Sequence, residues 1–161
     1  MVKHILIIAM ILFATNTSAG NAYPRSPEPS LTPGALCITP DSYRYPEQIP
    51  YCERALNSFN KESIFITYRA FGYSLSGDRG QYKVDHFIPL CAGGSNEPAN
   101  LWPQYYTISK ITDPLEALGC EVLALGKITQ KELIEIVVAA KADLKKAPEA
   151  IKAFKKILKR R

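Results

Sequence analysis

The chain has 161 residues and a mass of 17.9 kDa, enough for one domain with a sizeable core but not for two. Hydrophobic residues make up 47% and charged residues 22%, and these proportions exclude wholesale disorder, collagen-like repeats and low-complexity fibres. The formal net charge of +5 and a pI near 9.0 favour an anionic partner without identifying it.

The first 19 residues have the layout of a secretory signal peptide. Lys3 precedes an apolar run at 5–14, and small residues then favour cleavage after Ala19, with a second site as late as Ala22. As a helix this run would span about 15 Å, half of the roughly 30 Å hydrocarbon layer of a membrane. We therefore expect export without a stable membrane span. An uncleaved anchor is the alternative.

Export changes how the four cysteines are interpreted. An even number in an oxidising compartment predicts two disulfides. Four cysteines allow three connectivities, and local loop closure favours Cys37–Cys52 and Cys91–Cys120. A zinc site is the competing interpretation, but the sequence has no CxxC pair and both histidines lie elsewhere.

Prolines, β-branched residues and turn residues predict the secondary-structure elements that precede the central motif. Residues 23–50 hold seven of the twelve prolines and predict an extended segment of turns laid over the domain. Residues 51–62 predict a short helix, and 63–73 fit either a strand or a helix. A loop at 74–80 and a short strand within 81–90 follow.

Capping signals predict two helices in the second half of the chain. An Asp-Pro-Leu-Glu sequence predicts a helix from 112 to about 125, which Gly126 ends. Thr129 and Glu132 form a second capping box, which opens a helix to about residue 147. A basic segment at 148–161 completes the chain after a proline.

Most of the positive charge is at the C-terminal end. Residues 141–161 carry nine basic and two acidic side chains, a net +7, whereas residues 1–140 have a net charge of −2. Apolar residues recur at helical spacing from Ile151 to Leu158. They predict a helix that lays its apolar face on the domain and points its lysines at phosphate. A solvated helix end or a frayed terminus is the alternative.

The strongest chemical signal lies in residues 82–104, YKVDHFIPLCAGGSNEPANLWPQ. His86 can accept a proton near neutral pH if its other ring nitrogen is held, and Asn100 is a candidate to hold it. Asp85 supplies a hard oxygen ligand suited to Mg²⁺. The glycine pair at 93–94 allows the reversal that returns Asn100 beside His86. A salt-bridged surface Asp-His pair is the alternative.

This string resembles the signature of HNH endonucleases, specifically an exported group whose core reads DH, PL, GG, N and NLWPQ. The matching residues are Asp85-His86, Pro89-Leu90, Gly93-Gly94, Asn96 and Asn100-Leu101-Trp102-Pro103-Gln104. Weaker flanking matches extend the resemblance over roughly residues 34–140.

The resemblance implies an α+β domain with a ββα-metal core, also called a His-Me finger, with additional helices. It implies that His86 is the general base, that Asn100 orients it and that Asp85 binds a divalent metal ion, Mg²⁺. Related enzymes draw a further ligand from the helix. No histidine follows Asn100 here, so Asp113 is the candidate for that ligand and Gln104 a weaker one.

Arg79, Lys83 and Lys110 flank the motif and are candidates for phosphate contacts, although each also fits ordinary surface charge. Trp102 fits core packing better than stacking on bases.

We therefore expect residues 51–147 to form a metal-dependent endonuclease domain, monomeric and secreted or periplasmic. It would hydrolyse phosphodiester bonds of DNA, or also of RNA, with little sequence specificity. The alternatives are a nucleic-acid binding module without activity and a membrane-active protein that works through its basic C-terminal helix.

Overall fold

The computed structural model describes residues 23–53, 58–75 and 77–160. The predicted signal peptide lies outside the described residues. Helices and small sheets are mixed along the chain, which confirms the α+β class. The elements are β1 (Ser42–Arg44), β2 (Ile49–Tyr51), α1 (Ser58–Phe71), β3 (Tyr82–His86), β4 (Leu101–Tyr105), α2 (Tyr106–Ala124), α3 (Gln130–Ala142) and α4 (Ala147–Leu158).

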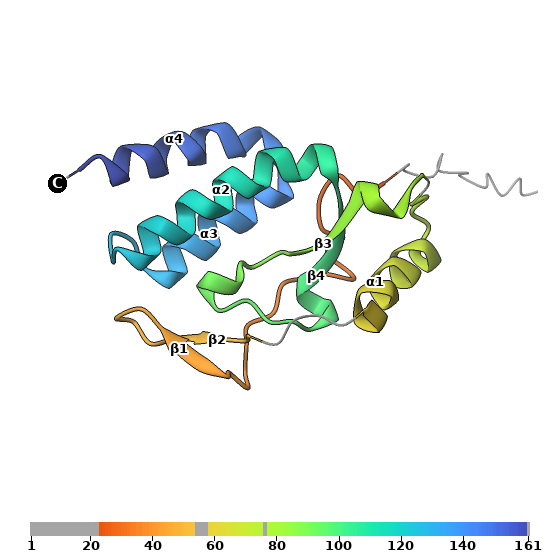
Figure 1. The fold of residues 1–161 in the computed structure, drawn as a ribbon. Coiled ribbons are helices and arrows are strands. Elements are labelled where there is room, and N and C mark those ends of the chain that lie inside the picture. Colours follow the sequence, from red (N-terminus) through yellow and green to blue (C-terminus); the bar gives the residue numbers. More distant parts are fainter. Residues whose placement is uncertain (1–22, 54–57, 76, 161) are drawn as a thin grey trace, which may run out of the picture.

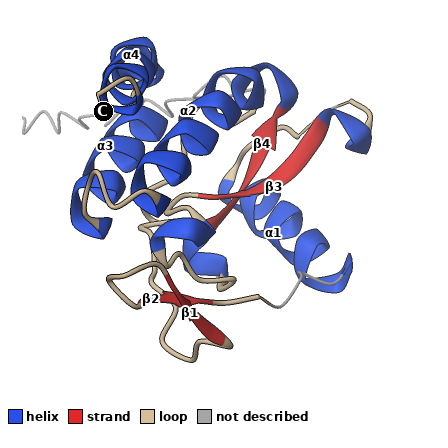
Figure 2. Cartoon of the chain, turned by 60° about the vertical axis from the view of Figure 1, so that its left-hand side comes forward, coloured by secondary structure: helices blue, strands red, loops and turns tan. Residues whose placement is uncertain are grey.

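The β3–β4 hairpin lies at the centre of the molecule. Its strands pair antiparallel from Tyr82 opposite Tyr105 to His86 opposite Leu101. β4 continues directly into α2, so the order is strand, loop, strand, helix. α1 packs on one side of the hairpin, and α2, α3 and α4 lie together on the other (Figures 1 and 2).

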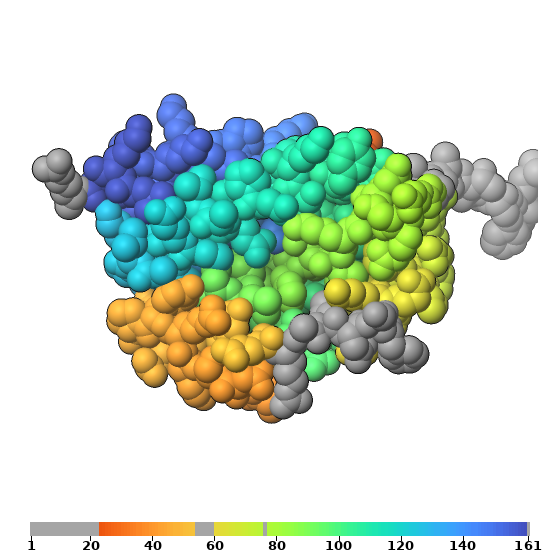
Figure 3. All heavy atoms as spheres, in the orientation of Figure 1, coloured from red at the N-terminus to blue at the C-terminus, as the bar shows by residue number. Residues whose placement is uncertain are grey.

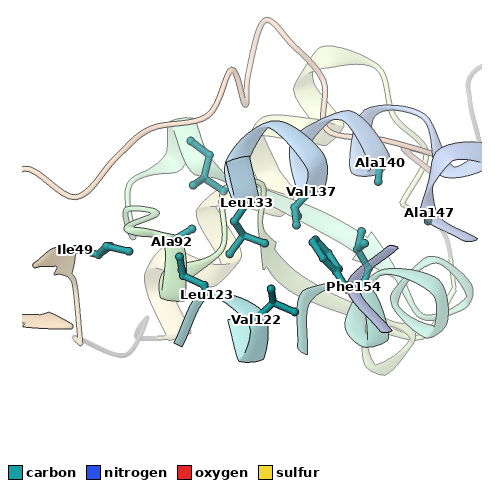
Figure 4. Packing of buried hydrophobic residues seen from close by; sticks show 11 residues of the cluster. Ile49, Ala92, Val122, Leu123, Leu133, Val137, Ala140, Ala147 and Phe154 are labelled. Carbon is teal, nitrogen blue, oxygen red and sulfur yellow. The ribbon is translucent and has the colours of Figure 1, made fainter. Parts of the chain in front are cut away.

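The three C-terminal helices share one hydrophobic core. Phe154 of α4 is fully buried beside Val122, Leu133 and Val137 (Figure 4). Gly119 permits this close packing, because a Cβ atom there would lie 2.5 Å from Leu133 Cδ1 and 3.1 Å from Phe154 Cε2. The apolar face of the basic C-terminal helix therefore belongs to the core, as predicted.

A second core joins α1 to the hairpin. Phe65, Tyr68 and Trp102 are among its fully buried members, which confirms that Trp102 is a packing residue. Thr32 ties the proline-rich segment to this core, because its hydroxyl donates to Leu101 O at 2.8 Å and lies 2.7 Å from the Tyr68 hydroxyl.

The proline-rich segment has no helix within its described residues 23–50, and its later part, orange in Figure 3, lies at the lower left of the molecule. Its chain pairs with the loop between β3 and β4 through the Leu36–Gly94 bridge. Both predicted disulfides are present, Cys37–Cys52 and Cys91–Cys120. They tie this segment to the chain after β2, and the β3–β4 loop to α2.

The helix predicted at 51–62 is found only in part among the described residues. Tyr51 belongs to β2, and the described part of α1 starts at Ser58. α1 then runs to Phe71, so most of the undecided stretch at 63–73 is helical. Tertiary packing explains this, because Ile64, Phe65 and Tyr68 fall on one buried face at helical spacing.

α2 begins at Tyr106 rather than at 112, and Pro114 lies inside it. The expected capping box at its start does not form, because the two carboxylates are used elsewhere. Asp113 pairs with Lys83, and Glu116 pairs with Lys141.

The second capping box is confirmed. Thr129 accepts a hydrogen bond from Glu132 N, and the Glu132 side chain accepts one from Thr129 N. α3 ends at Ala142, earlier than expected, because Asp143 breaks the helix and its side chain accepts from Lys145 N at the start of the next turn. None of the helices in the described part of the chain has the length and apolar character needed to span a bilayer.

Candidate active site

His86 is half-buried at the end of β3, and its ring is held by Asn96. The distance from His86 Nε2 to Asn96 Oδ1 is 2.8 Å, while Asn96 Nδ2 donates to Cys52 O at 3.2 Å. Because an amide oxygen only accepts hydrogen bonds, Nε2 carries the proton in this contact. His86 Nδ1 then keeps its lone pair and can accept a proton.

The electrostatic surroundings keep this imidazole neutral near pH 7. Burial lowers the pKa of His86 below its ordinary value, and the Lys141 ammonium lowers it further. The hydrogen bond to Asn96 and the carboxylates of Asp85 and Glu116 act in the opposite direction but do not reverse the shift. A neutral imidazole is the form that a general base requires.

Asn100 does not make the contact with the His86 imidazole that we expected. Its amide is fully buried and clamps the loop instead: Oδ1 accepts from Ile88 N at 2.8 Å, and Nδ2 donates to Ile88 O at 3.0 Å and Ser95 O at 2.9 Å. Asn96 takes the orienting position. Both asparagines belong to the same motif, and their spacing alone did not distinguish these two tasks.

The glycine pair is needed for the reversal of this loop, as predicted. Gly93 has a φ of 80°, in the left-handed region. A Cβ atom on Gly94 would lie 1.9 Å from Ile88 O. The backbone therefore turns back close to Ile88, which brings the Asn96 side chain to the His86 ring.

The Asp85 side chain, in β3, is buried, and three side-chain nitrogens contact its carboxylate. Its Oδ2 accepts from Lys141 Nζ at 2.8 Å and from Gln104 Nε2 at 3.1 Å, and its Oδ1 lies 3.0 Å from Lys83 Nζ. Burial alone would raise the pKa of Asp85, but the ammonium groups of Lys141 and Lys83 lower it below its ordinary value.

Lys141, which the sequence placed at the start of the basic C-terminal region, is fully buried instead. Besides Asp85, its ammonium donates to Glu116 Oε2 at 2.8 Å and to His86 O at 2.5 Å. We call Lys141 and these three oxygen partners the Lys141 cluster. Burial would lower the pKa of Lys141, but the two carboxylates raise it, so the side chain remains an ammonium ion.

A divalent metal ion does not fit the residues as they are arranged. The Lys141 ammonium contacts the carboxylate of Asp85, the predicted metal ligand, and also the neighbouring oxygens of Glu116 and His86. Within the described residues, no three His, Cys, Asp or Glu side chains are grouped so that they could hold one. Gln104 Oε1 is buried without a hydrogen-bond partner, but one neutral oxygen does not offset the ammonium.

The predicted second ligand, Asp113, lies across an ammonium group from Asp85. Lys83 Nζ forms ion pairs with both carboxylates. These side chains and Glu116 line an open hollow of about 350 Å³, which does not include the His86 ring. Asp85 and His86 therefore contact different parts of the protein, and no hydrogen bond joins their side chains in the described structure.

Arg79 and Lys110 do not surround His86 either. Arg79 lies just before β3 and Lys110 lies in the first turns of α2, after the end of β4 that is opposite to the His86 end of the hairpin. The Arg79 guanidinium lies 3.3 Å from the Phe65 ring centroid, and the Lys110 ammonium lies 4.9 Å from that of Tyr106.

The exposed face of α4 forms a separate basic surface. A hollow of about 550 Å³ lies there, lined by Pro148, Ile151, Lys152, Lys155, Lys156 and Lys159. We call its four lysines the α4 lysines. Four of the six described residues that line this hollow are lysines, so its charge favours an anionic partner.

Sequence reasoning missed the roles of Asn96 and Lys141. A signal for Lys141 existed: it is four residues after Val137 and eight after Leu133, so it lies on the buried face of α3.

Comparison of the chain with family models, curated proteins and solved structures finds no match.

Proposed function

We propose that the protein is an exported endonuclease that hydrolyses phosphodiester bonds of DNA, or also of RNA, with His86 as the general base. The observation that carries this proposal is the imidazole held through Nε2 by Asn96, with Nδ1 left to accept a proton. Its place at the end of the first strand of a strand, strand, helix unit supports the HNH-type core.

In this reaction His86 Nδ1 accepts a proton from water as the water oxygen attacks phosphorus. The bond between phosphorus and the 3′-oxygen breaks, and the leaving oxygen takes a proton from solvent. Asn96 keeps the ring in the tautomer that accepts at Nδ1, and the Asn100 clamp holds the loop that carries Asn96.

The α4 lysines supply affinity for the polymer as a whole. Lysine contacts with phosphates are independent of base sequence and weaken as salt rises. Such contacts support cleavage with little sequence specificity, by a protein that needs no partner subunit. The two disulfides are consistent with an oxidising compartment, and we include secretion or a periplasmic location in the proposal.

The test is degradation of plasmid DNA and of RNA by purified mature protein and its variants. We expect His86→Ala to lose about 10² to 10⁴-fold in rate, the usual contribution of a general base. Asn96→Ala should lose less, because the base remains but is no longer oriented. Removal of an exposed ring, Tyr43→Ala, is the control and should leave the rate unchanged. A folded His86→Ala variant that cuts as fast as the wild type contradicts the proposal.

A second candidate is a module that binds nucleic acid without cutting it. The Lys141 cluster favours this candidate, since an ammonium occupies the carboxylate of Asp85, the residue that the HNH resemblance assigns to a metal ion. For this candidate the expected result is that the wild type retards DNA in a gel-shift assay without nicking it. The charge reversals Lys155→Glu and Lys156→Glu reduce both the affinity and its dependence on salt.

The third alternative, a membrane-active helix, has less support. Such a helix needs a free apolar face. In α4 that face is centred on Phe154, which is fully buried in the core.

A further inference from the structure

The Lys141 cluster gathers oxygens that have the chemistry of a cation site. They come from three points on two elements: the Asp85 carboxylate and the His86 carbonyl in β3, and the Glu116 carboxylate in α2. Carboxylate and carbonyl oxygens are the ligands that hard divalent ions prefer. The Lys141 ammonium lies 2.8 Å from the Asp85 oxygen, 2.5 Å from the His86 carbonyl oxygen and 2.8 Å from the Glu116 oxygen. It therefore donates hydrogen bonds to all three at once.

This ammonium has no alternative partner in solvent. Lys141 is 0% exposed, whereas Lys145, four residues further along the chain, is exposed. A buried ammonium is costly unless it is paired and fully hydrogen-bonded, and Lys141 uses its three donors on three acceptors. Its departure would leave the buried Asp85 carboxylate close to that of Glu116, which is 26% exposed, with Lys83 as the remaining cation beside Asp85, so the cluster favours a second cation.

We propose that the Lys141 ammonium is a built-in cation that takes the place of a divalent metal ion in this site. The protein therefore binds no metal ion there. A second consequence rests on the proposed nuclease function: the enzyme needs no metal ion for activity. Lys141 is a positioning residue: it holds Asp85 and the end of β3, including the backbone of His86, in the place where an HNH-type enzyme is expected to use a metal.

The first test measures metal binding by the full mature protein with Mn²⁺, by electron paramagnetic resonance. We expect the wild type to bind no Mn²⁺ in this cluster. Lys141→Ala should gain one bound Mn²⁺ per chain, because the three oxygens are released for a new cation. The same variant with Glu116→Gln should lose it again. Lys145→Ala removes the same charge from an exposed neighbour and is the control that should bind none.

Wild-type binding of one Mn²⁺ that Asp85→Asn abolishes would overturn the proposal, whether or not the Lys141 variants fold. If Lys141→Ala keeps its circular dichroism spectrum but gains no metal, the cluster is a salt bridge without the geometry of a cation site, and the proposal fails as well.

The second test adds excess EDTA to the nuclease assay. Activity that is unchanged supports the proposal, and activity that EDTA abolishes and Mg²⁺ restores contradicts it. The two proposals fail separately: a wild type that cuts nothing under any condition rejects the nuclease, while the Mn²⁺ measurement still decides the role of Lys141.

Discussion

At the scale of single residues, burial and partners separate side chains that the sequence presents as equivalent. Asn96 and Asn100 both belong to the motif. Asn100 is fully buried on the backbone of the loop, and Asn96 holds the ring of His86. Lys141 and Lys145 are four residues apart, but the first is in the core and the second is in solvent.

The buried carboxylate of Asp85 predicts sensitivity to acid. Burial alone would raise the pKa of Asp85, but the opposite effect of Lys141 and Lys83 is larger. The pKa of Asp85 in the folded protein therefore lies below its ordinary value of 3.8. The unfolded state then binds more protons as the pH falls. Stability from this group is complete above about pH 4 to 5 and is lost as the pH falls through the folded pKa.

Urea unfolding between about pH 6 and pH 2 tests this prediction. The wild type should lose more of its free energy of unfolding on acidification than Asp85→Asn, whose amide does not titrate. Asp113→Asn, which changes an exposed carboxylate, should follow the wild type. Equal losses in all three proteins would show that Asp85 contributes no such linkage.

At the scale of elements, α2 is longer than its capping signals indicated. Its first turn has no side-chain cap, and the helix follows β4 without a linker. Buried residues from Ile108 to Leu123 hold both ends of α2 in the two cores. This packing outweighs the local preference for a helix start at Pro114.

Pro114 therefore lowers the stability of α2, and the packing of the helix offsets this loss. It lacks the N–H that would bond to Lys110 O inside the helix. We expect Pro114→Ala to raise the free energy of unfolding by about 1 to 3 kcal/mol, measured by urea denaturation. Pro148→Ala is the matched control. Pro148 lies in the first turn of α4, where proline is favourable, so that change should not stabilise the protein. Equal effects would contradict the prediction.

At the scale of the whole molecule, two disulfides close segments of different length. Cys37–Cys52 closes a segment of 15 residues, and Cys91–Cys120 closes one of 29 and joins the β3–β4 loop to α2. In the chain-entropy model these bonds are worth roughly 3 and 3.5 kcal/mol respectively.

We expect the paired change Cys91→Ser and Cys120→Ser to cost more stability than Cys37→Ser and Cys52→Ser. The longer loop loses more entropy when it is closed, and its bond also anchors the loop that carries Asn96 and Asn100. Urea unfolding of both variants measures the difference, and fully reduced wild type should be less stable than either. A larger loss for the Cys37–Cys52 pair would reverse the prediction.

Much of the architecture was accessible from sequence because it depends on neighbours along the chain. The capping box at Thr129, the reversal at Gly93-Gly94 and both cysteine pairings were predicted from local rules and are present. His86 and Asp85 were singled out as candidates, but the roles of their partners Asn96 and Lys141 were not. Asn100 was assigned to the ring of His86 and instead contacts the loop backbone.

The sequence by itself determined where the chain turns, which cysteines pair and which strand ends in the Asp-His pair, since each depends on short-range geometry. Only the tertiary structure decided what Asp85 binds, because its partner Lys141 is 56 residues away and reaches it from the last turn of α3. A buried carboxylate takes whichever cation the fold places beside it, and in this protein that cation is an ammonium group.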